Sequence, residues 1–133
     1  MAQMESSQLD MARKIEKKGI SEIPADSRPV YHLSSPVGWM NDPNGFSVYQ
    51  KEYHLFFQYH PFSKIWGPMH WGHCKSSDFI RWEYLPVAMA PDEKYDAGGC
   101  YSGSAIEVEG EHVLLYTGVT DRYPLTNRYV ELS

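Results

Sequence analysis

The chain has 133 residues and a formal net charge of −5, with 17 acidic against 12 basic side chains. A chain of this length forms one modest domain, and its negative charge argues against nucleic acid or an anionic membrane as a partner. The sequence has no apolar run near the roughly 18 residues of a membrane span. Residues 1–7 show no basic or apolar leader, so we expect a cytoplasmic protein in which Cys74 and Cys100 are free thiols.

The first expected element is a short α-helix over residues 7–18. Ser7 and Asp10 are spaced like the members of a capping box, and lysines gather toward the far end, before Gly19. Isolated helices of this length are marginal in water, so a frayed tail is the alternative. Residues 20–29 contain two prolines and are predicted to be an extended linker.

From residue 30 onward the sequence pattern changes from helical to strand-like. A polar break at residues 76–78 and a loop rich in proline and glycine interrupt the strands, and a hairpin turns at residues 109–111. The expected strands are 46–49, 53–59, 69–75, 81–85, 105–108 and 112–117. Short strands separated by turn signals predict an all-β fold, but strand counting alone fits a β-sandwich as well as a β-propeller.

Residues 39–45, which read Trp-Met-Asn-Asp-Pro-Asn-Gly, form the most informative run in the chain. Pro43 disfavours the helical region for Asp42, and Asn44-Gly45 is a strong signal for a tight turn with positive φ. The backbone therefore holds the carboxylate of Asp42 on both sides, as a nucleophile or a ligand requires. On these residues alone, a turn without any function is an equally good reading.

Three further blocks follow this run: Phe-Gln-Tyr-His-Pro at 57–61, Trp-Gly-Pro-Met-His-Trp-Gly-His at 66–73 and Tyr-Ser-Gly-Ser-Ala at 101–105. In order and approximate spacing, the four blocks together resemble glycoside hydrolase family 32. This family contains invertases, β-fructofuranosidases and sucrose-6-phosphate hydrolases. The resemblance extends over residues 30–118.

The resemblance implies a five-bladed β-propeller, of which this chain would supply the N-terminal part, about one and a half blades. We therefore divide the chain into an N-terminal helix and linker at 1–29 and a partial propeller at 30–133, which comprises blade one and the start of blade two. An unclosed propeller leaves a wide strand edge exposed. We expect the chain to be the N-terminal part of a longer protein.

The resemblance also implies roles for individual side chains. Asp42 would be the nucleophile of a retaining glycosidase, and Asn41 would orient that carboxylate and hydrogen-bond the sugar. The other side chains expected at the substrate are Trp39, Met40, Gln58, Trp66, Tyr101 and Ser102. No cofactor is expected.

Several of these residues also have a plain structural interpretation. Gln58 would satisfy backbone groups, Trp66 would pack against Pro68, and Ser102 would cap a turn. The remaining expectations concern burial: Trp71 and Trp82 in the core, Asp92, Glu93 and Asp96 in a solvated loop, and Glu107 and Glu109 facing outward.

The second half of the catalytic machinery is missing from this sequence. Retaining glycosidases use two carboxyl groups about 5–5.5 Å apart. The family's acid/base Glu, which precedes a Cys, and its Arg-Asp-Pro motif are both absent here. We therefore expect no useful activity from the chain alone.

The expected partner is a small sugar: sucrose, sucrose 6-phosphate or a short fructan. The sequence leaves open hydrolysis against fructosyl transfer, and also the oligomeric state. A non-catalytic carbohydrate-binding remnant and a poorly folded product of an interrupted gene are the alternatives. A zinc site at His70, His73 and Cys74, completed by Cys100 or His60, is disfavoured because residues 70 and 73 of a strand point to opposite faces.

Overall fold

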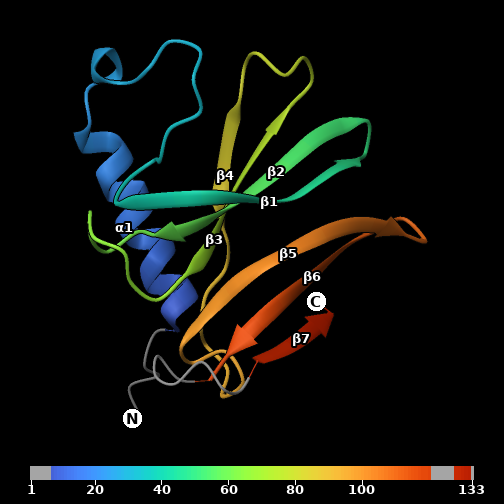
Figure 1. Ribbon diagram of the computed structural model, residues 1–133. Coiled ribbons are helices and arrows are strands. Elements are labelled where there is room, and N and C mark those ends of the chain that lie inside the picture. Colours follow the sequence, from blue (N-terminus) through green and yellow to red (C-terminus); the bar gives the residue numbers. More distant parts are fainter. Residues whose placement is uncertain (1–6, 121–127, 133) are drawn as a thin grey trace, which may run out of the picture.

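The computed structural model describes residues 7–120 and 128–132. Strands dominate these residues, and a helix precedes them (Figure 1). The elements are α1 (Gln8–Glu22), a 3₁₀ turn (Ala25–Ser27), β1 (Trp39–Tyr49), β2 (Glu52–His60), β3 (His70–Ser76), β4 (Glu83–Met89), β5 (Gly99–Val108), β6 (Glu111–Val119) and β7 (Arg128–Leu132). The prediction of an all-β fold preceded by a short helix is confirmed.

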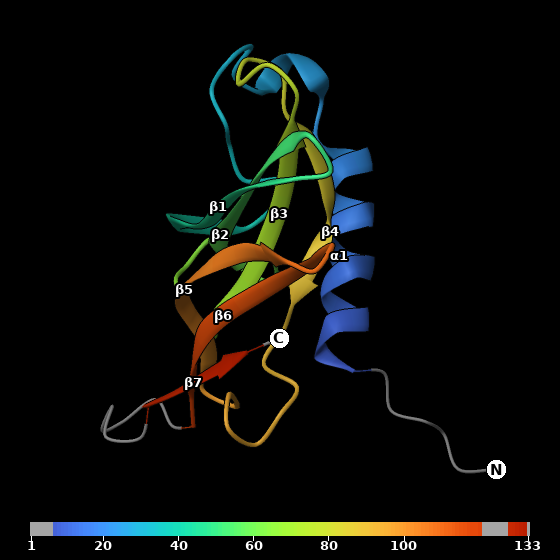
Figure 2. The same cartoon turned by 90° about the vertical axis from the view of Figure 1, so that its right-hand side faces the viewer.

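The strands form two antiparallel sheets in which chain order is also spatial order. One sheet has the order β1-β2-β3-β4 and the other β5-β6-β7. The sheet of β5 and β6 crosses the first one on the side of β1, as Figures 1 and 2 show. Consecutive antiparallel pairing of this kind needs only short connections.

Three strands extend well beyond the bounds that the sequence pattern predicted. β1 already begins at Trp39, β4 continues through Pro86 to Met89, and β5 begins at Gly99. Proline is tolerated in a sheet only at edges and bulges. β1 and β4 are the two edge strands of their sheet, and the register of both is irregular.

Helix α1 begins as predicted but ends later. The Ser7 hydroxyl accepts a hydrogen bond from the Asp10 N–H at 3.1 Å, whereas Gly19 lies inside the helix and Ile23 caps its end. A Cβ atom on Gly19 would lie 2.3 Å from Cγ1 of Val37, so Gly19 allows the chain to pass close to the helix. The expected linker at 20–29 is wrong in its first part, which is helical.

The helix packs along the edge strand β4 (Figure 2). Arg13 Nε donates to the carbonyl of Val87 at 3.0 Å, and Glu16 Oε2 accepts from the N–H of Val87 at 3.1 Å. Two helix side chains thus satisfy both backbone groups of one edge residue, as a neighbouring strand would. This packing explains why a helix that is marginal in isolation forms here.

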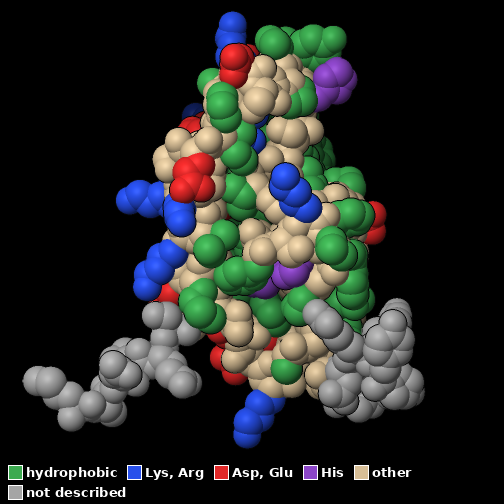
Figure 3. All heavy atoms as spheres, turned by 90° about the vertical axis from the view of Figure 1, so that its left-hand side faces the viewer, with side chains coloured by type: hydrophobic (Ala, Val, Ile, Leu, Met, Phe, Trp, Pro, Cys, Tyr) green, Lys and Arg blue, Asp and Glu red, His purple; other side chains and the backbone are tan. Residues whose placement is uncertain are grey.

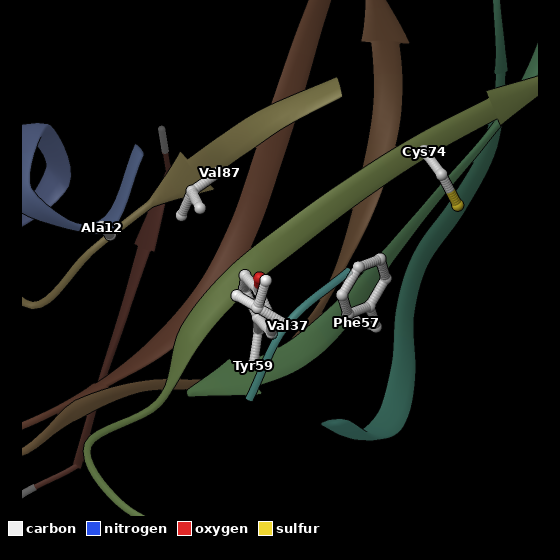
Figure 4. Packing of buried hydrophobic residues seen from close by; sticks show 6 residues of the cluster. All are labelled: Ala12, Val37, Phe57, Tyr59, Cys74 and Val87. Atoms are coloured by element: carbon white, nitrogen blue, oxygen red, sulfur yellow. The ribbon is translucent and has the colours of Figure 1, made fainter. Parts of the chain in front are cut away.

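The four-stranded sheet carries a core on each face, because neighbouring strand residues point to opposite sides. Phe57 joins the cluster beneath the helix, and Phe56 joins the cluster shared with the second sheet. The helix-side cluster contains Ala12, Val37, Phe57, Tyr59, Cys74 and Val87 (Figure 4). The other contains Phe56, Trp71, Cys100 and Tyr116.

The burial predictions for the two core tryptophans hold in different degrees. Trp71 is fully buried, and Trp82 is partly buried against the helix-side cluster. Both cysteines are buried and free, as expected. Among the helical residues described, none belongs to a stretch long and apolar enough to cross a membrane.

Candidate active site

The residues of the informative run lie at a β-bulge. Met40 pairs with Tyr59 and Pro43 pairs with Phe57, so Asn41 and Asp42 together face the single residue Gln58. A bulge of this kind bends the strand and redirects its side chains, and it occurs often beside active sites. Asp42 is exposed at this point, and Asn41 is half-buried.

A second irregularity follows directly. Asn44 pairs with Phe56 and Ser47 with His54, so two residues again face one on β2. Gly45 has a φ of 54°, which confirms the positive φ expected there. The expected tight turn is wrong, because the pairing with β2 continues past this point. A bulge, like a tight turn, can require a residue with positive φ, so the same sequence signal fits both.

Asn44 is a functional candidate that sequence reasoning treated only as a turn residue. Its side chain is 5% exposed. Nδ2 donates to the carbonyl of Asp42 at 3.3 Å, while Oδ1 accepts from the N–H of Gly103 at 3.3 Å. Asn44 therefore ties the backbone of Asp42 to β5. The Asn44-Gly45 pair is a sequence signal for a bulge as well as for a tight turn, so the sequence alone did not reveal this role of Asn44.

Two predicted site residues, Tyr101 and Ser102, lie on β5 at another bulge. Tyr101 pairs with Thr117 and Gly103 with Tyr116, so Ser102 is an extra residue with no partner in the register. Ser102 is exposed. Three of the predicted positions, Asn41, Asp42 and Ser102, thus coincide with bulges.

Gln58 connects the bulge at Asn41 and Asp42 to β5, the strand that carries the bulge at Ser102. Its side chain is 2% exposed, and Nε2 donates to the carbonyl of Cys100 at 3.2 Å. The indole Nε1 of Trp71 donates in the same way to the carbonyl of Tyr101 at 3.1 Å. Gln58 thus satisfies a backbone group, as its structural interpretation held, and in doing so it joins β2 to the strand that carries Tyr101 and Ser102.

The aromatic site residues contact polar and aromatic neighbours. Trp39 Nε1 donates to Asn41 Oδ1 at 2.8 Å, which fixes the orientation of this amide. Trp66 is 45% exposed and lies edge-to-face with Tyr101, with ring centroids 6.5 Å apart. Met40, which pairs with Tyr59, packs partly buried against the helix-side cluster.

The acidic loop before β5 corrects two expectations. Glu93 is exposed as expected, but the exposed Asp92 accepts hydrogen bonds from the N–H groups of Gln8 at 2.5 Å and Leu9 at 3.0 Å, and Asp96 is only 1% exposed. Burial and the neighbouring Asp96 carboxylate raise the pKa of the Cys100 thiol and of the Tyr116 hydroxyl, so both stay protonated at neutral pH. Glu107 and Glu109 are exposed, as expected.

The histidines and cysteines of the disfavoured zinc alternative have other neighbours in the structure. Within residues 7–120 and 128–132, no group of three or more His, Cys, Asp or Glu side chains is placed to hold a metal ion. Nδ1 of His70 lies 2.9 Å from the carbonyl of Pro68, whereas Nε2 of His73 lies 2.9 Å from Nδ1 of His54. Burial lowers the pKa of His70 to about 4.

Two surface hollows lie away from the predicted site residues. A hollow of about 410 Å³ lies elsewhere, lined by residues 28–34, 80–82 and 84, and another of about 330 Å³ lies between α1 and β4. Neither hollow is lined by a predicted site residue.

Comparison with known proteins gives a consistent result. Residues 32–131 match the family model described as glycosyl hydrolases family 32 N-terminal domain. The sucrose-6-phosphate hydrolase of Zymomonas mobilis is 50% identical over 102 residues, which are 77% of this chain and 20% of that protein. The levanase of Bacillus subtilis is 52% identical over 98 residues, 74% of this chain and 14% of the levanase.

Solved structures resemble the fold as well as the sequence. The Bombyx mori GH32 beta-fructofuranosidase has a TM-score of 0.77 at 46% identity. The match covers 94% of this chain and 27% of the beta-fructofuranosidase chain. The Lactobacillus gasseri sucrose-6-phosphate hydrolase has a TM-score of 0.79 at 36% identity. The match covers 96% of this chain and 26% of the hydrolase chain. The chain spans about a fifth of the length of the curated relatives. It belongs to glycosyl hydrolase family 32, whose N-terminal domain it matches over residues 32–131.

Proposed function

We propose that this chain supplies the nucleophile and part of the fructose-binding wall of a retaining β-fructofuranosidase that acts on sucrose or sucrose 6-phosphate. The observation that carries the proposal is the bulge that places Asn41 and Asp42 opposite Gln58. Gln58 in turn bonds to the strand that bears Tyr101 and Ser102. Strands linked in this way thus carry a carboxylate, amides, a hydroxyl and aromatic rings, which is the chemistry of a sugar site.

In the proposed reaction, the Asp42 carboxylate attacks the anomeric carbon of the fructosyl unit as the bond to the leaving-group oxygen breaks. A carboxylic acid outside this sequence protonates that oxygen, and water later releases fructose and regenerates the carboxylate. Asn41 orients the carboxylate. Gln58 and Ser102 contact fructosyl hydroxyls, and Trp39, Trp66 and Tyr101 form the apolar wall.

The proposal extends to the architecture. Residues 30–133 would form blade one and the start of blade two of a five-bladed propeller, with residues 1–29 as helix and connection. The support is the meander of four strands followed by a new sheet. The substrate would be a small sugar met in the cytoplasm, where buried free thiols such as Cys74 and Cys100 persist.

The test is a hybrid enzyme. Residues 32–119 would replace the matching segment of the Zymomonas mobilis sucrose-6-phosphate hydrolase, which is 50% identical over 102 residues. We expect the hybrid to cleave sucrose and Asp42→Asn to reduce kcat by at least about 10³-fold. Glu109→Gln, an exposed carboxylate outside the proposed site, is the matched control and should retain activity.

A folded hybrid whose Asp42→Asn variant cleaves sucrose at the unsubstituted rate would exclude Asp42 as nucleophile. Trapping of a fructosyl ester by rapid quenching and peptide mass spectrometry, on the peptide that contains Asp42, checks the covalent step independently. A peptide labelled elsewhere would contradict the assignment.

The second candidate is a carbohydrate-binding remnant that never turns over. The absence of the Glu-Cys and Arg-Asp-Pro sequences favours it for the chain by itself. A fructose titration of the chain, followed by two-dimensional NMR, separates the two. Binding at Trp39 and Gln58 with no trapped ester in the hybrid supports the remnant.

A further inference from the structure

Asp96 is a buried carboxylate in the loop between β4 and β5. Its side chain is 1% exposed. Oδ1 accepts a hydrogen bond from the N–H of Glu93 at 2.8 Å, and Oδ2 accepts one from the Tyr116 hydroxyl at 2.8 Å. The thiol of Cys100 donates to the same Oδ2 at 3.5 Å. Three neutral donors therefore surround this one group.

A buried carboxylate is costly unless a cation or several donors compensate it. Among the described residues, the recorded ion pairs join other side chains, and none involves Asp96. Hydrogen bonds from Tyr116, Cys100 and the backbone therefore compensate the charge. Such a group ties its donors to fixed positions, because each donor that moves away leaves the carboxylate less compensated.

The donors that Asp96 holds belong to the segment behind the proposed site. The carbonyl of Asp96 accepts from the N–H of Gly99 at 2.7 Å, and the N–H of Cys100 donates to the carbonyl of Met69 at 2.8 Å. Cys100 thus touches Asp96 through its thiol and Gln58 through its carbonyl. The next two residues along the chain are Tyr101 and Ser102.

We propose that Asp96 is a positioning residue for fructosyl binding, acting through Cys100 on Gln58, Tyr101 and Ser102. This inference rests on the proposed function. Asp96 does not itself reach the sugar surface, since it is buried behind β5. Its carboxylate fixes where β5 starts relative to β2 and β3, and thereby sets the carbonyl that holds the Gln58 amide.

Asparagine at position 96 keeps the size but replaces one acceptor oxygen with a donor. That donor would face either the Glu93 N–H or the cluster of the Tyr116 hydroxyl and Cys100 thiol, so the network cannot be satisfied as before. We expect the start of β5 to shift, and Gln58 and the Trp71 indole to lose their fixed carbonyl partners.

The experiment compares the unsubstituted full chain with Asp96→Asn, using NMR resonances of the Gln58 side-chain amide and the Trp71 indole N–H. We expect both resonances to shift or broaden in Asp96→Asn. The matched control is Glu93→Gln, which removes an exposed carboxylate from the same loop and should leave both resonances in place. Unchanged Gln58 and Trp71 resonances in a folded Asp96→Asn chain would overturn the proposal.

Tyr116→Phe is the second variant, should Asp96→Asn fail to fold. It keeps the carboxylate and removes one donor, so the same resonances should move in the same direction by a smaller amount. Unmoved resonances in Tyr116→Phe would overturn the proposal in that case.

The hybrid enzyme separates this inference from the proposed function. There we expect Asp96→Asn to raise KM roughly tenfold or more, with a smaller change in kcat, because the nucleophile is untouched. An equal loss in Asp96→Asn and Glu93→Gln would overturn the positioning role. An inactive hybrid with Asp96 intact would instead count against the proposed function, and the NMR comparison would still decide the role of Asp96.

Discussion

Gly45 occupies a position where both the backbone and the surroundings exclude a side chain. Its φ is 54°, and a Cβ atom would lie 2.8 Å from Cδ2 of Phe56 and 3.2 Å from both Cβ of Ala105 and Cζ3 of Trp71. The glycine therefore allows β1 to approach β5 at the bulge beside Asn44. A side chain here would push apart the strands that form the proposed site.

We predict that Gly45→Ala lowers the free energy of unfolding by about 2–4 kcal/mol, from backbone strain and overpacking together. Gly110→Ala is the matched control, since φ is 85° there but a Cβ would meet nothing within 4 Å. Its loss should be near 1 kcal/mol, from strain alone. Urea unfolding measures both, and equal losses would contradict the crowding argument.

The sequence predicted the local backbone of this run better than its pairing with the neighbouring strand. The run at 39–45 indicated a fixed Asp42 and a positive φ, because proline and glycine act locally. Bulge and turn place the same demands on the chain, so only the partner strand distinguishes them. Asp96 looked solvated because its compensating donor, Tyr116, lies 20 residues further along the chain.

Among the elements, three histidines link the two sheets. His54 on β2 and His73 on β3 share a hydrogen bond of 2.9 Å, and His112 on β6 contacts Ser47 Oγ at 2.9 Å. The ring centroids of His54 and His112 are 5.0 Å apart. Burial and mutual repulsion lower the pKa of His73 to about 3, and burial lowers the pKa of His54 and His112.

Because these pKa values lie below the unfolded value near 6.5, the unfolded chain binds more protons. The contribution of this cluster is fully present above pH 6.5 and is lost as the pH falls toward 3. We predict that stability drops by more than about 1.4 kcal/mol between pH 7 and pH 5. The charged groups that face these histidines are Glu52, Lys75 and Glu107.

Unfolding by urea at several pH values measures this dependence. His73→Gln should flatten it, whereas the exposed His32→Gln should leave it unchanged. A flat profile in the unsubstituted chain, or equal flattening in both variants, would contradict the role of the cluster.

The contribution of Glu16 in α1 to stability depends on pH in the opposite direction. Burial raises the pKa of this carboxyl from 4.5, so its contribution is present below pH 4.5 and is lost as the pH rises through the folded value. We predict that Glu16→Gln gains stability relative to the unsubstituted chain as the pH rises from 4.5 to 7. Glu22→Gln, at the exposed end of the same helix, should show no such trend.

The existence and type of the long elements followed from the sequence, but their ends did not. Gly19 lies inside the helix and does not end it. Val37 packs in the space that a side chain at position 19 would occupy. Strand β4 continues through Pro86 because an edge strand tolerates a missing donor. Both ends depend on residues distant in sequence, which local patterns cannot detect.

At the scale of the whole molecule, the surface carries many apolar side chains. Figure 3 shows hydrophobic side chains spread over one face between the charged ones. Val30 is 96% exposed, Ile65 74% and Ile106 59%. Scattered apolar residues are normal, but a connected patch favours association.

We predict that the isolated chain self-associates in a concentration-dependent way. Ile106 and Val108 lie two residues apart on β5, an edge strand of its sheet, so they share one exposed face. Sedimentation velocity should show less association in Ile106→Thr than in the unsubstituted chain. The exposed neighbour Glu107→Gln is the control, and an equal effect in both variants would contradict the patch.

The bulge on β1 also determines which genetic changes the site can tolerate. Asn41 and Asp42 together face one residue of β2. Substitution of either one changes a side chain and leaves the pairing intact. Deletion of either one would close the bulge: one residue would then face Gln58, Met40 and Pro43 would keep their partners, and the bend that redirects the site side chains would be lost. Length at this point is therefore under stricter constraint than residue identity, and a loss of one codon would be more damaging than most single substitutions there.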